Sequence, residues 1–374
     1  MSTFNNGNII GYDWVEEEIV SDDDLSIKTR RYFNNEQEEK IDDNPKFSYS
    51  PVYINYENGL PIKTEYYENN DLVRQEDYEY LSTHGYPIKV LIDVGDHYNT
   101  DQMLGYNYNL EWPKLSLKSV TEYCNDNITL TDSYSHTYNS YDLPSQVSHT
   151  VDGTTYTQHF LYPFDFNDNI SLSMVRNNII KQPLETFSSI GNLVFSGTKT
   201  AYRDSTQLFM PDKIYNLETV NGLSESNRAG GYALNVEYEM YGPHGNILQI
   251  SERGQRTAYI WGYNHQYPIA EIKGATYAQV VAALGGVTAV ENFTSTPDPT
   301  DQEVWQFLQP LLTGSITAYS QATVYTYKSL VGITSQTAPN GMRIYYEYDS
   351  AGRLMSIKDT NGHTVKQYQY HYKP

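Results

Sequence analysis

The side chains best suited to catalysis or metal binding in this sequence are nine histidines, one cysteine and 46 acidic residues. No pair of histidines has the His-Glu-x-x-His spacing that presents two zinc ligands on one face of a helix. Cys124 stands in the stretch TEYCNDN, and the sequence pairs no histidine with it, although a thiol needs such a neighbour to become a strong nucleophile. We therefore expect Cys124 to be an inert thiol, and His363 and His371 to be surface histidines.

Acidic clusters suggest calcium in two places, but neither has the spacing of a calcium loop. Three aspartates at 22–24 are adjacent, whereas an EF-hand alternates its ligands and has glycine at its sixth position. The stretch DFNDN (165–169) begins like such a loop, but Ile170 and Arg176 replace the required glycine and glutamate. We expect no metal and no cofactor. A carboxylate pair for glycoside hydrolysis stays open, because such a pair needs only proximity in space.

The charge of the chain argues against two classes of partner. The formal net charge is −21, and residues 1–50 carry 12 acidic and 5 basic side chains. Nucleic acids and anionic membranes bind basic surfaces, so we expect neither as a partner. No apolar run approaches the ~20 residues of a membrane-spanning helix. The start, MSTFNNGNIIGYDWVEEE, lacks the basic and apolar regions of a signal peptide, so we expect either a protein that stays inside the cell or a piece of a longer exported one.

The elements that must position these side chains have the pattern of strands and turns. The sequence has 37 tyrosines, 11 phenylalanines and 4 tryptophans, and tyrosine packs as a flat surface while its hydroxyl stays hydrated or hydrogen-bonded. From about Lys46, short runs rich in Tyr, Val, Ile and Thr alternate with turn residues such as Asn58-Gly59, which favour hairpins. Many short strands at this spacing predict an all-β antiparallel meander.

Pairs of tyrosines support the strand prediction. Tyr-x-Tyr triplets occur at 78/80, 106/108, 325/327, 346/348, 368/370 and 370/372. Alternate residues lie on the same face of a strand, so we expect both rings of a triplet on one face. Packing between neighbouring strands explains such rows, and stacking on sugar rings is the alternative.

One segment has a helical pattern instead. In TYAQVVAALGG, apolar residues recur at spacings of three and four over 277–284, and glycine follows as a helix end. TDQEVWQFLQPLL repeats this spacing over 304–311, after a Thr-x-x-Glu capping box. We predict a two-helix insertion over 274–316 that packs across the sheet or covers its edge, because an exposed edge invites aggregation. Pro310 should kink the second helix or end it early.

A repeat combines the turns with the tyrosines. The stretch YDSAGRLMSI (348–357) aligns without gaps with YGPHGNILQI (241–250). Asp349 and Asp359 begin Asp-x-x-Gly units typical of a type I turn, because the Asp side chain bonds the backbone two residues on and Gly accepts the left-handed conformation. We assign the motif a structural role and no catalytic one. Its residues are Tyr241, Gly245, Asn246, Tyr348, Asp349, Gly352, Arg353, Asp359, Gly362, Tyr368 and Tyr370.

The closing stretch YEYDSAGRLMSIKDTNGHTVKQYQY resembles the YD repeat of the RHS family, bacterial proteins that are secreted or associated with the cell surface. Relatives of that family include toxin-encapsulating shells and the teneurins. The resemblance is specific over 341–370, good over 238–263 and worn elsewhere, as in YNSYDLPSQV (138–147), and it extends over about 46–374. It implies an antiparallel sheet that spirals into a hollow or partly closed shell. The chain ends at Pro374 without a toxin domain, so we expect that it does not enclose cargo by itself.

These observations divide the chain into four parts. They are an acidic, partly disordered N-terminal segment (1–45), a degenerate YD-repeat β-sheet (46–273), the helical insertion (274–316) and C-terminal YD repeats (317–374). We predict a non-enzymatic structural or interaction segment of an RHS-like cell-surface or secreted protein, with a protein or a glycan as its partner. Two other hypotheses remain: a carbohydrate-binding module that uses exposed tyrosines, and a fragment of a toxin-encapsulating shell.

Overall fold

The computed structural model describes residues 12–20, 26–35, 57–84, 88–93, 103–108, 111–124, 128–151, 153–205, 208–313, 316 and 319–370. The chain divides into two compact units. Unit 1 comprises Met1–Leu161, Thr186–Phe195 and Asn221–Glu225, and unit 2 comprises Tyr162–Glu185, Ser196–Val220 and Ser226–Pro374. Every strand pairing within the described ranges is antiparallel, as the sequence pattern predicts.

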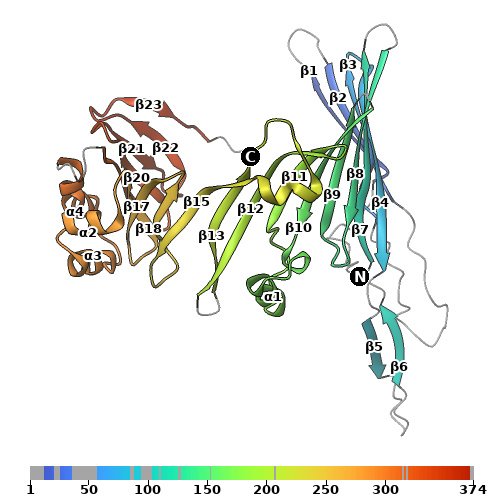
Figure 1. The fold of residues 1–374 in the computed structure, drawn as a ribbon. Helices are drawn as coiled ribbons and strands as arrows, with labels where there is room; N and C mark the ends of the chain where they lie inside the picture. Colours follow the sequence, from blue (N-terminus) through green and yellow to red (C-terminus); the bar gives the residue numbers. More distant parts are fainter. Residues whose placement is uncertain are drawn as a thin grey trace, which may run out of the picture. The chain divides into compact units, whose positions relative to one another are not determined.

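Unit 1 is a meander of mostly long strands (Figure 1). In pairing order these are β1 (Trp14–Val20), β2 (Ser26–Phe33), β3 (Pro61–Glu68), β4 (Asp71–His84), β7 (Glu111–Cys124), β8 (Ile128–Tyr138), β9 (Pro144–Val151) and β10 (Thr154–Leu161). A separate hairpin joins β5 (Ile88–Asp93) to β6 (Met103–Tyr108). The turn between β3 and β4 consists of Asn69 and Asn70, both at positive φ, which is the conformation that a two-residue hairpin requires.

The acidic segment 1–45 contributes two strands where the structure describes it. β1 pairs along its whole length with β2, and β2 pairs with β3. Opposite charges face each other across the first pair, with Arg30 Nη2 2.6 Å from Glu16 Oε2, and such cross-strand pairs stabilise a sheet. The sheet therefore begins before residue 46, the expected boundary, because charge pairing replaces the apolar alternation on which that boundary rested.

Unit 2 continues the meander with shorter strands. In pairing order they are β12 (Leu193–Ser205), β13 (Leu208–Leu217), β15 (Tyr232–Tyr241), β16 (Ile247–Glu252), β17 (Gln255–Gly262), β18 (Tyr267–Lys273), β19 (Gln321–Lys328), β20 (Gly332–Thr337), β21 (Arg343–Tyr348), β22 (Leu354–Lys358) and β23 (Thr364–Gln367). The first residues of β12 belong to unit 1, where they pair with β14 (Leu223–Ser224). Strand β11 (Glu185–Ile190) and the 3-10 helix η3 (Glu225–Gly231) also carry residues of both units.

The stretch that begins like a calcium loop is a helix cap. Residues 163–176 form the 3-10 helix η2 (Pro163–Asp165) and the helix α1 (Asn169–Arg176). The Asp168 carboxylate accepts hydrogen bonds from the backbone N–H groups of Ile170 and Ser171. An N-cap aspartate satisfies otherwise unpaired N–H groups in this way, which explains the acidic residue without a cation.

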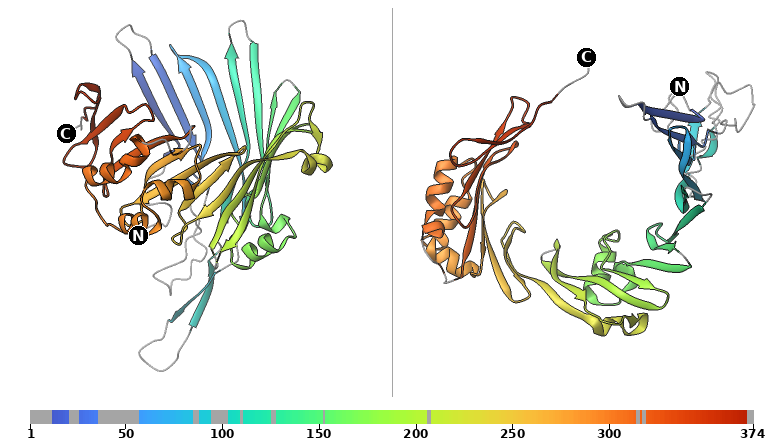
Figure 2. Two further views of the ribbon diagram at one scale, coloured as in Figure 1. Left: turned by 60° about the vertical axis from the view of Figure 1, so that its left-hand side comes forward. Right: turned by 90° about the horizontal axis from the view of Figure 1, so that it is seen from above.

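The predicted insertion contains three helices, one more than expected. They are α2 (Tyr277–Ala283), α3 (Val287–Thr294) and α4 (Asp301–Thr313), and they lie on one face of the strands of unit 2 (Figure 2). The predicted capping box of α4 is present, because Glu303 accepts from Thr300 N and Thr300 accepts from Glu303 N. Pro310 does not end α4, which continues to Thr313. The extra helix α3 is short, and its apolar pattern is too brief to be recognised in sequence.

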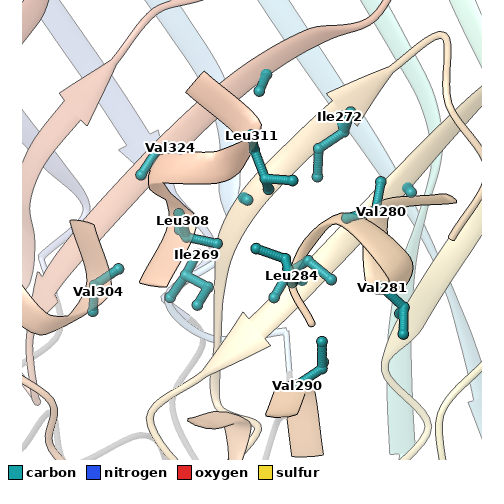
Figure 3. Close-up of a cluster of buried hydrophobic side chains, with 14 of the residues drawn as sticks. Ile269, Ile272, Val280, Val281, Leu284, Val290, Val304, Leu308, Leu311 and Val324 are labelled. Atoms are coloured by element: carbon teal, nitrogen blue, oxygen red, sulfur yellow. The ribbon is translucent and has the colours of Figure 1, made fainter. Parts of the chain in front are cut away.

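A hydrophobic core lies between these helices and the sheet (Figure 3). Ile272 of β18 and Val324 of β19 meet Val280 of α2 and Leu308 of α4, and each is at most 1% exposed. Full burial of one such side chain contributes about 1.5–3 kcal/mol to stability. The insertion thus packs across the face of the sheet, one of the two placements that the sequence predicts.

Candidate functional site

The turn after β21 contains the most specific part of the repeat. Asp349 N donates to Arg353 O at 2.9 Å, and Gly352 N donates to Asp349 O at 3.0 Å. The Asp349 carboxylate accepts from the backbone N–H groups of Ala351 and Arg353, and its other oxygen lies 2.6 Å from Arg353 Nη2. The Arg353 side chain and these backbone bonds hold the pKa of Asp349 below its ordinary value. Gly352 has φ 75°, the left-handed conformation that the motif predicts.

The same backbone turn recurs along the chain. Four other described turns make both of its backbone bonds, and they start at Asn139, Gly242, Ala338 and Asp359. Asp359 and Asn139 each use Oδ1 to accept from two backbone N–H groups, as Asp349 does. In the worn copy at 138–147, Asp142 takes φ 62° where Gly352 stands in the other copy. The degenerate repeat therefore forms the same turn with aspartate in the place of glycine.

The tyrosine that precedes the turn has a contact that the sequence does not reveal. Tyr348, the last residue of β21, donates its hydroxyl hydrogen to the carbonyl of Ile333 on β20 at 2.9 Å. We call this contact, from a tyrosine hydroxyl to a backbone carbonyl of a neighbouring strand, a tyrosine clamp. It satisfies the polar end of a half-buried ring and joins two strands beyond their backbone pairing.

The clamp is repeated in both units at 2.6–2.9 Å. Its donors are Tyr80, Tyr138, Tyr241, Tyr327, Tyr348 and Tyr370, and the respective acceptors are the carbonyls of Pro61, Leu115, Pro211, Pro268, Ile333 and Leu354. Trp261 takes the same place on β17, where its indole Nε1 donates to Ile247 O at 2.7 Å. Three of the six carbonyls that accept from a clamp tyrosine belong to prolines, which have a backbone carbonyl but no N–H.

A β-bulge accompanies most clamps. The register with the next strand shifts immediately before Tyr80, Tyr138, Tyr241, Trp261, Tyr327 and Tyr348. In each case the extra residue of the bulge lies on the next strand, as Met355 of β22 does opposite Glu347 and Tyr348. At this point the strand of the clamp residue therefore faces a bulge on one side and the clamp acceptor on the other.

The Tyr-x-Tyr triplets contain two kinds of contact. In 78/80, 325/327 and 346/348 the register with the next strand shifts between the two tyrosines, and the extra residue lies on that next strand. The second tyrosine forms the clamp, whereas the first has a different partner: Tyr78 donates to Glu76 at 2.5 Å and Tyr346 to Gln336 at 3.4 Å. The triplets therefore combine two roles and do not form one continuous aromatic row.

The last repeat connects its turn to its clamp. The Tyr370 hydroxyl donates to Leu354 O, and the Arg353 guanidinium lies 4.6 Å from the centre of the Tyr370 ring. Tyr368 lies after the end of β23, and its backbone N–H bonds to Met355 O. The structure thus brings most of the predicted motif into turns and clamps, and Tyr368 joins them only through its backbone.

Among the described residues three glutamates are buried, namely Glu65, Glu76 and Glu185, and the first two have a shifted pKa. Glu65 is 7% exposed and accepts from the hydroxyls of Tyr32 and Tyr67 at 2.8 Å, with Lys63 Nζ 2.7 Å away. Burial raises the pKa of Glu65, but the bonds from Lys63, Tyr32 and Tyr67 outweigh burial and leave this pKa below its ordinary value. A general acid needs the opposite, a raised pKa.

Glu76 repeats this arrangement. It is 4% exposed, and its partners are the Tyr78 hydroxyl at 2.5 Å, Lys118 Nζ at 3.1 Å and Arg74 Nη2 at 2.6 Å. Burial again raises the pKa, and the three partners lower it further than burial raises it. Both carboxylates are therefore held in the charged form by their neighbours, as in a structural ion network.

Two of the residues that the sequence analysis considered for chemistry lie on the surface. Cys124 and His363 are exposed, and His371 lies outside the described residues. Within the ranges that the structure describes, no cluster of three or more His, Cys, Asp or Glu could hold a metal ion. None of the described helices is long and apolar enough to span a membrane.

Comparison with known proteins finds one family in the C-terminal part of the chain. Residues 331–364 match the model of the RHS repeat, and this range contains β20 to β22 and the turns at Asp349 and Asp359. No curated protein matches the sequence of this chain. The match thus covers all but the last six residues of the stretch 341–370, where the sequence resemblance is most specific.

Among solved structures, the chain is similar to two complexes. The crystal structure of TcdB2-TccC3-TEV gives a TM-score of 0.49 at 9% identity and covers 97% of this chain and 21% of the other. The crystal structure of TcdB2-TccC3 gives 0.48 at 10% identity, with 96% and 21% covered. This chain therefore spans about a fifth of the length of those chains.

Proposed function

Because residues 331–364 are an RHS repeat, we propose that this chain is a non-enzymatic structural and interaction segment of an RHS-like cell-surface or secreted protein. The observation that supports this most directly is the clamp that recurs in both units. Its tyrosines use their hydroxyls to tie strands together, so the most abundant aromatic residue serves the sheet itself. An antiparallel sheet held together in this way can bind partners on its surface and needs no catalytic centre.

The charges of the sheet also support a structural role. Glu65 and Glu76 each contact a basic side chain and at least one tyrosine hydroxyl. Buried carboxylates of this kind contribute to one defined arrangement, because breaking the pair leaves an uncompensated charge. Their lowered pKa values suit ion pairing better than proton donation.

The partner that we propose is a protein or a glycan outside the cell. An acidic chain with formal charge −21 is poorly suited to nucleic acids or anionic membranes. The glycan hypothesis requires tyrosine faces that a sugar ring can reach, whereas five of the six clamp tyrosines are only partly exposed. The carbohydrate-binding module and the toxin-shell fragment therefore stay secondary hypotheses.

A location experiment tests the cellular part of the proposal. Intact cells of the source organism are treated with a membrane-impermeant biotin reagent, and the full-length protein is then recovered and probed for biotin. We expect labelling on intact cells or recovery from the medium. Labelling only after lysis, with a cytosolic marker behaving in the same way, would contradict a surface or secreted location.

A second experiment separates the structural role from catalysis. The variants E65Q and E76Q each remove a buried carboxylate with a lowered pKa, and Y348F/Y370F removes two clamps. If the role is structural, the binding of a partner by each of the three variants should be proportional to the amount of folded protein. Folded E65Q or E76Q protein that has lost this binding would favour a binding or catalytic site at these carboxylates.

A further inference from the structure

Four Asn-Gly pairs lie within the described ranges, at 58/59, 221/222, 340/341 and 361/362. Asparagine is a labile residue, because the backbone nitrogen of the next residue can attack its side-chain carbonyl carbon. Glycine in that next position has no Cβ to hinder the attack. The four pairs therefore share one reactive chemistry, and they differ in what the glycine N–H bonds to.

In three pairs the glycine N–H already has a partner. These glycines donate to backbone carbonyls: Gly59 to Asn34 at 2.8 Å, Gly341 to Ala338 at 2.9 Å and Gly362 to Asp359 at 3.0 Å. The last two bonds close turns of the repeat. A bonded N–H must lose its partner before its nitrogen can give up the proton and attack. The repeat turn thus protects the asparagine that it contains.

The pair at 221/222 lacks this protection. The N–H of Gly222 has no hydrogen-bond partner among the described residues, because the pairing of β14 with β12 begins one residue later, at Leu223 and Val194. Asn221 is exposed and Gly222 is partly exposed. Val220, the preceding residue, is 97% exposed. The amide, the attacking nitrogen and water can therefore meet in the folded chain.

The fold also requires glycine at this position. Gly222 has φ 76°, and a Cβ there would lie 3.3 Å from Leu193 Cβ and 3.4 Å from Val194 O. A residue with a side chain would be both crowded and strained in this conformation. The structure therefore retains beside Asn221 the residue that makes an asparagine most reactive.

We propose that Asn221 is a modification site, the Asn-Gly pair at which the folded chain deamidates first. The Gly222 nitrogen loses its proton to water and forms a bond to Asn221 Cγ, and the side-chain nitrogen Nδ2 leaves as ammonia. The product is a cyclic succinimide. Water then opens this ring at one carbonyl or the other, which gives aspartate or isoaspartate. The reaction needs water as its only co-reactant.

Either product alters the chain at the start of β14. Both carry a carboxylate in place of the amide, which adds negative charge to a chain of formal charge −21. Isoaspartate also routes the backbone through the side chain of residue 221, just before Leu223 and Ser224, the two residues that pair with β12. We expect this product to loosen that pairing. The change accumulates with time and is independent of the structural role proposed above.

Peptide mapping of the full chain by mass spectrometry, after ageing in a mildly alkaline buffer, measures the conversion of each amide to an acid. We expect Asn221 to react about twofold to tenfold faster than Asn340 and Asn361, the range that one backbone hydrogen bond corresponds to. In urea the three rates should become similar, because the turn bonds are lost. Equal rates in the folded chain, or a slower reaction at Asn221, would overturn the proposal.

Two variants locate the effect. N221Q removes the reactive amide, and N340Q is the matched control, which should deamidate at Asn221 as fast as the parent chain. After ageing, the parent chain and N340Q should lose hydrogen-exchange protection at Leu223 and Ser224, whereas N221Q should retain it. Thermal unfolding of fresh samples confirms that both variants fold. Loss of protection in N221Q to the same extent would show that the change arises elsewhere, and the proposal would be wrong.

Discussion

The Tyr348 hydroxyl lies 2.9 Å from the carbonyl oxygen of Ile333, so the last residue of one strand is tied to the first part of the strand before it. Tyr138, Tyr241, Tyr327 and Tyr370, at or near a strand end, and Tyr80, within β4, also bond a carbonyl of a neighbouring strand. This gives the tyrosine of the repeat a physical role, because the hydroxyl fixes where one strand ends relative to its neighbour.

Removing one clamp hydroxyl should cost measurable stability. Y348F leaves the Ile333 carbonyl without this partner, and we expect a loss of about 0.5–1.5 kcal/mol. Urea unfolding measures the loss, and hydrogen exchange should locate it in β20 and β21. Y345F is the matched control, because no described partner bonds the Tyr345 hydroxyl, and it should be nearly neutral. Equal losses in both variants would contradict the clamp.

The clamp also explains why residue 332 is glycine. A Cβ on Gly332 would lie 2.5 Å from the Tyr348 hydroxyl oxygen, and Gly332 has φ 153°. We expect G332A to cost about 1–3 kcal/mol through the clash and backbone strain. In the Y348F background the same substitution should cost less, because the closest atom is gone. Thermal unfolding of the four proteins forms a double-mutant cycle, and simple additivity would refute the link.

Acid should weaken the network around Glu76. The pKa of Glu76 is lower in the folded protein than its ordinary value of 4.5, so the folded state binds this proton less tightly than the unfolded chain. The stabilisation is therefore fully present above about pH 4.5 and is lost as the pH falls through the folded pKa. We expect E76Q to be less stable than the parent chain at neutral pH, and the difference to shrink toward pH 3. Urea midpoints at several pH values measure it, and a constant difference would contradict the prediction.

High pH should also destabilise the fold, through ionisation of the buried tyrosines. Burial, the largest cause, raises the pKa of Tyr241 and Tyr263 to about 12 from the ordinary 10.0. The folded state therefore holds these protons more tightly, and the stabilisation is present below pH 10 and lost between pH 10 and about 12. We expect ultraviolet titration to show one group of tyrosines ionising near pH 10 and another ionising together with loss of the β-sheet signal. Ionisation of every tyrosine near pH 10 with the fold intact would refute this.

The insertion should stabilise unit 2 through its apolar contacts. Leu308 of α4 is 0% exposed and belongs to the core shared with β18 and β19. We expect L308A to cost about 2–5 kcal/mol, through lost burial and the cavity left behind. Q309A changes an exposed neighbour on the same helix and should have little effect. Denaturant unfolding measures the free energy of unfolding of both variants, and equal values for L308A and Q309A would show that the helices contribute little to stability.

The structure confirms the fold class that the sequence predicts, an antiparallel meander with a small helical insertion. Period-two runs, turn residues at regular spacing and one stretch of three- and four-residue spacing are local signals, and local signals suffice for element type. The sequence missed β1 and β2 because acidic residues dominate that segment, although opposite charges pair across the strands. It missed α3 because eight residues are too few for a clear period.

The turn residues of the candidate site were predictable for the same reason. Asp349 and Gly352 are three positions apart and form one turn, so their spacing predicts their bonds. Trp261 could not be recognised as an equivalent of the tyrosines, because its role depends on a carbonyl fourteen residues earlier. Gly362 and Gly222 both follow asparagine, and only the folded chain shows that the first bonds its N–H within a turn whereas the second has no partner among the described residues.

The sequence by itself determined the repeat, the turns and the antiparallel strands, because each follows from residues within about ten positions of one another. Only the tertiary structure decided what the tyrosines do. The Tyr346 hydroxyl bonds to the side chain of Gln336, whereas the Tyr348 hydroxyl bonds to the carbonyl of Ile333. Such a contact joins a side chain to the backbone of another strand, and a backbone carbonyl has no residue identity that a sequence pattern could display.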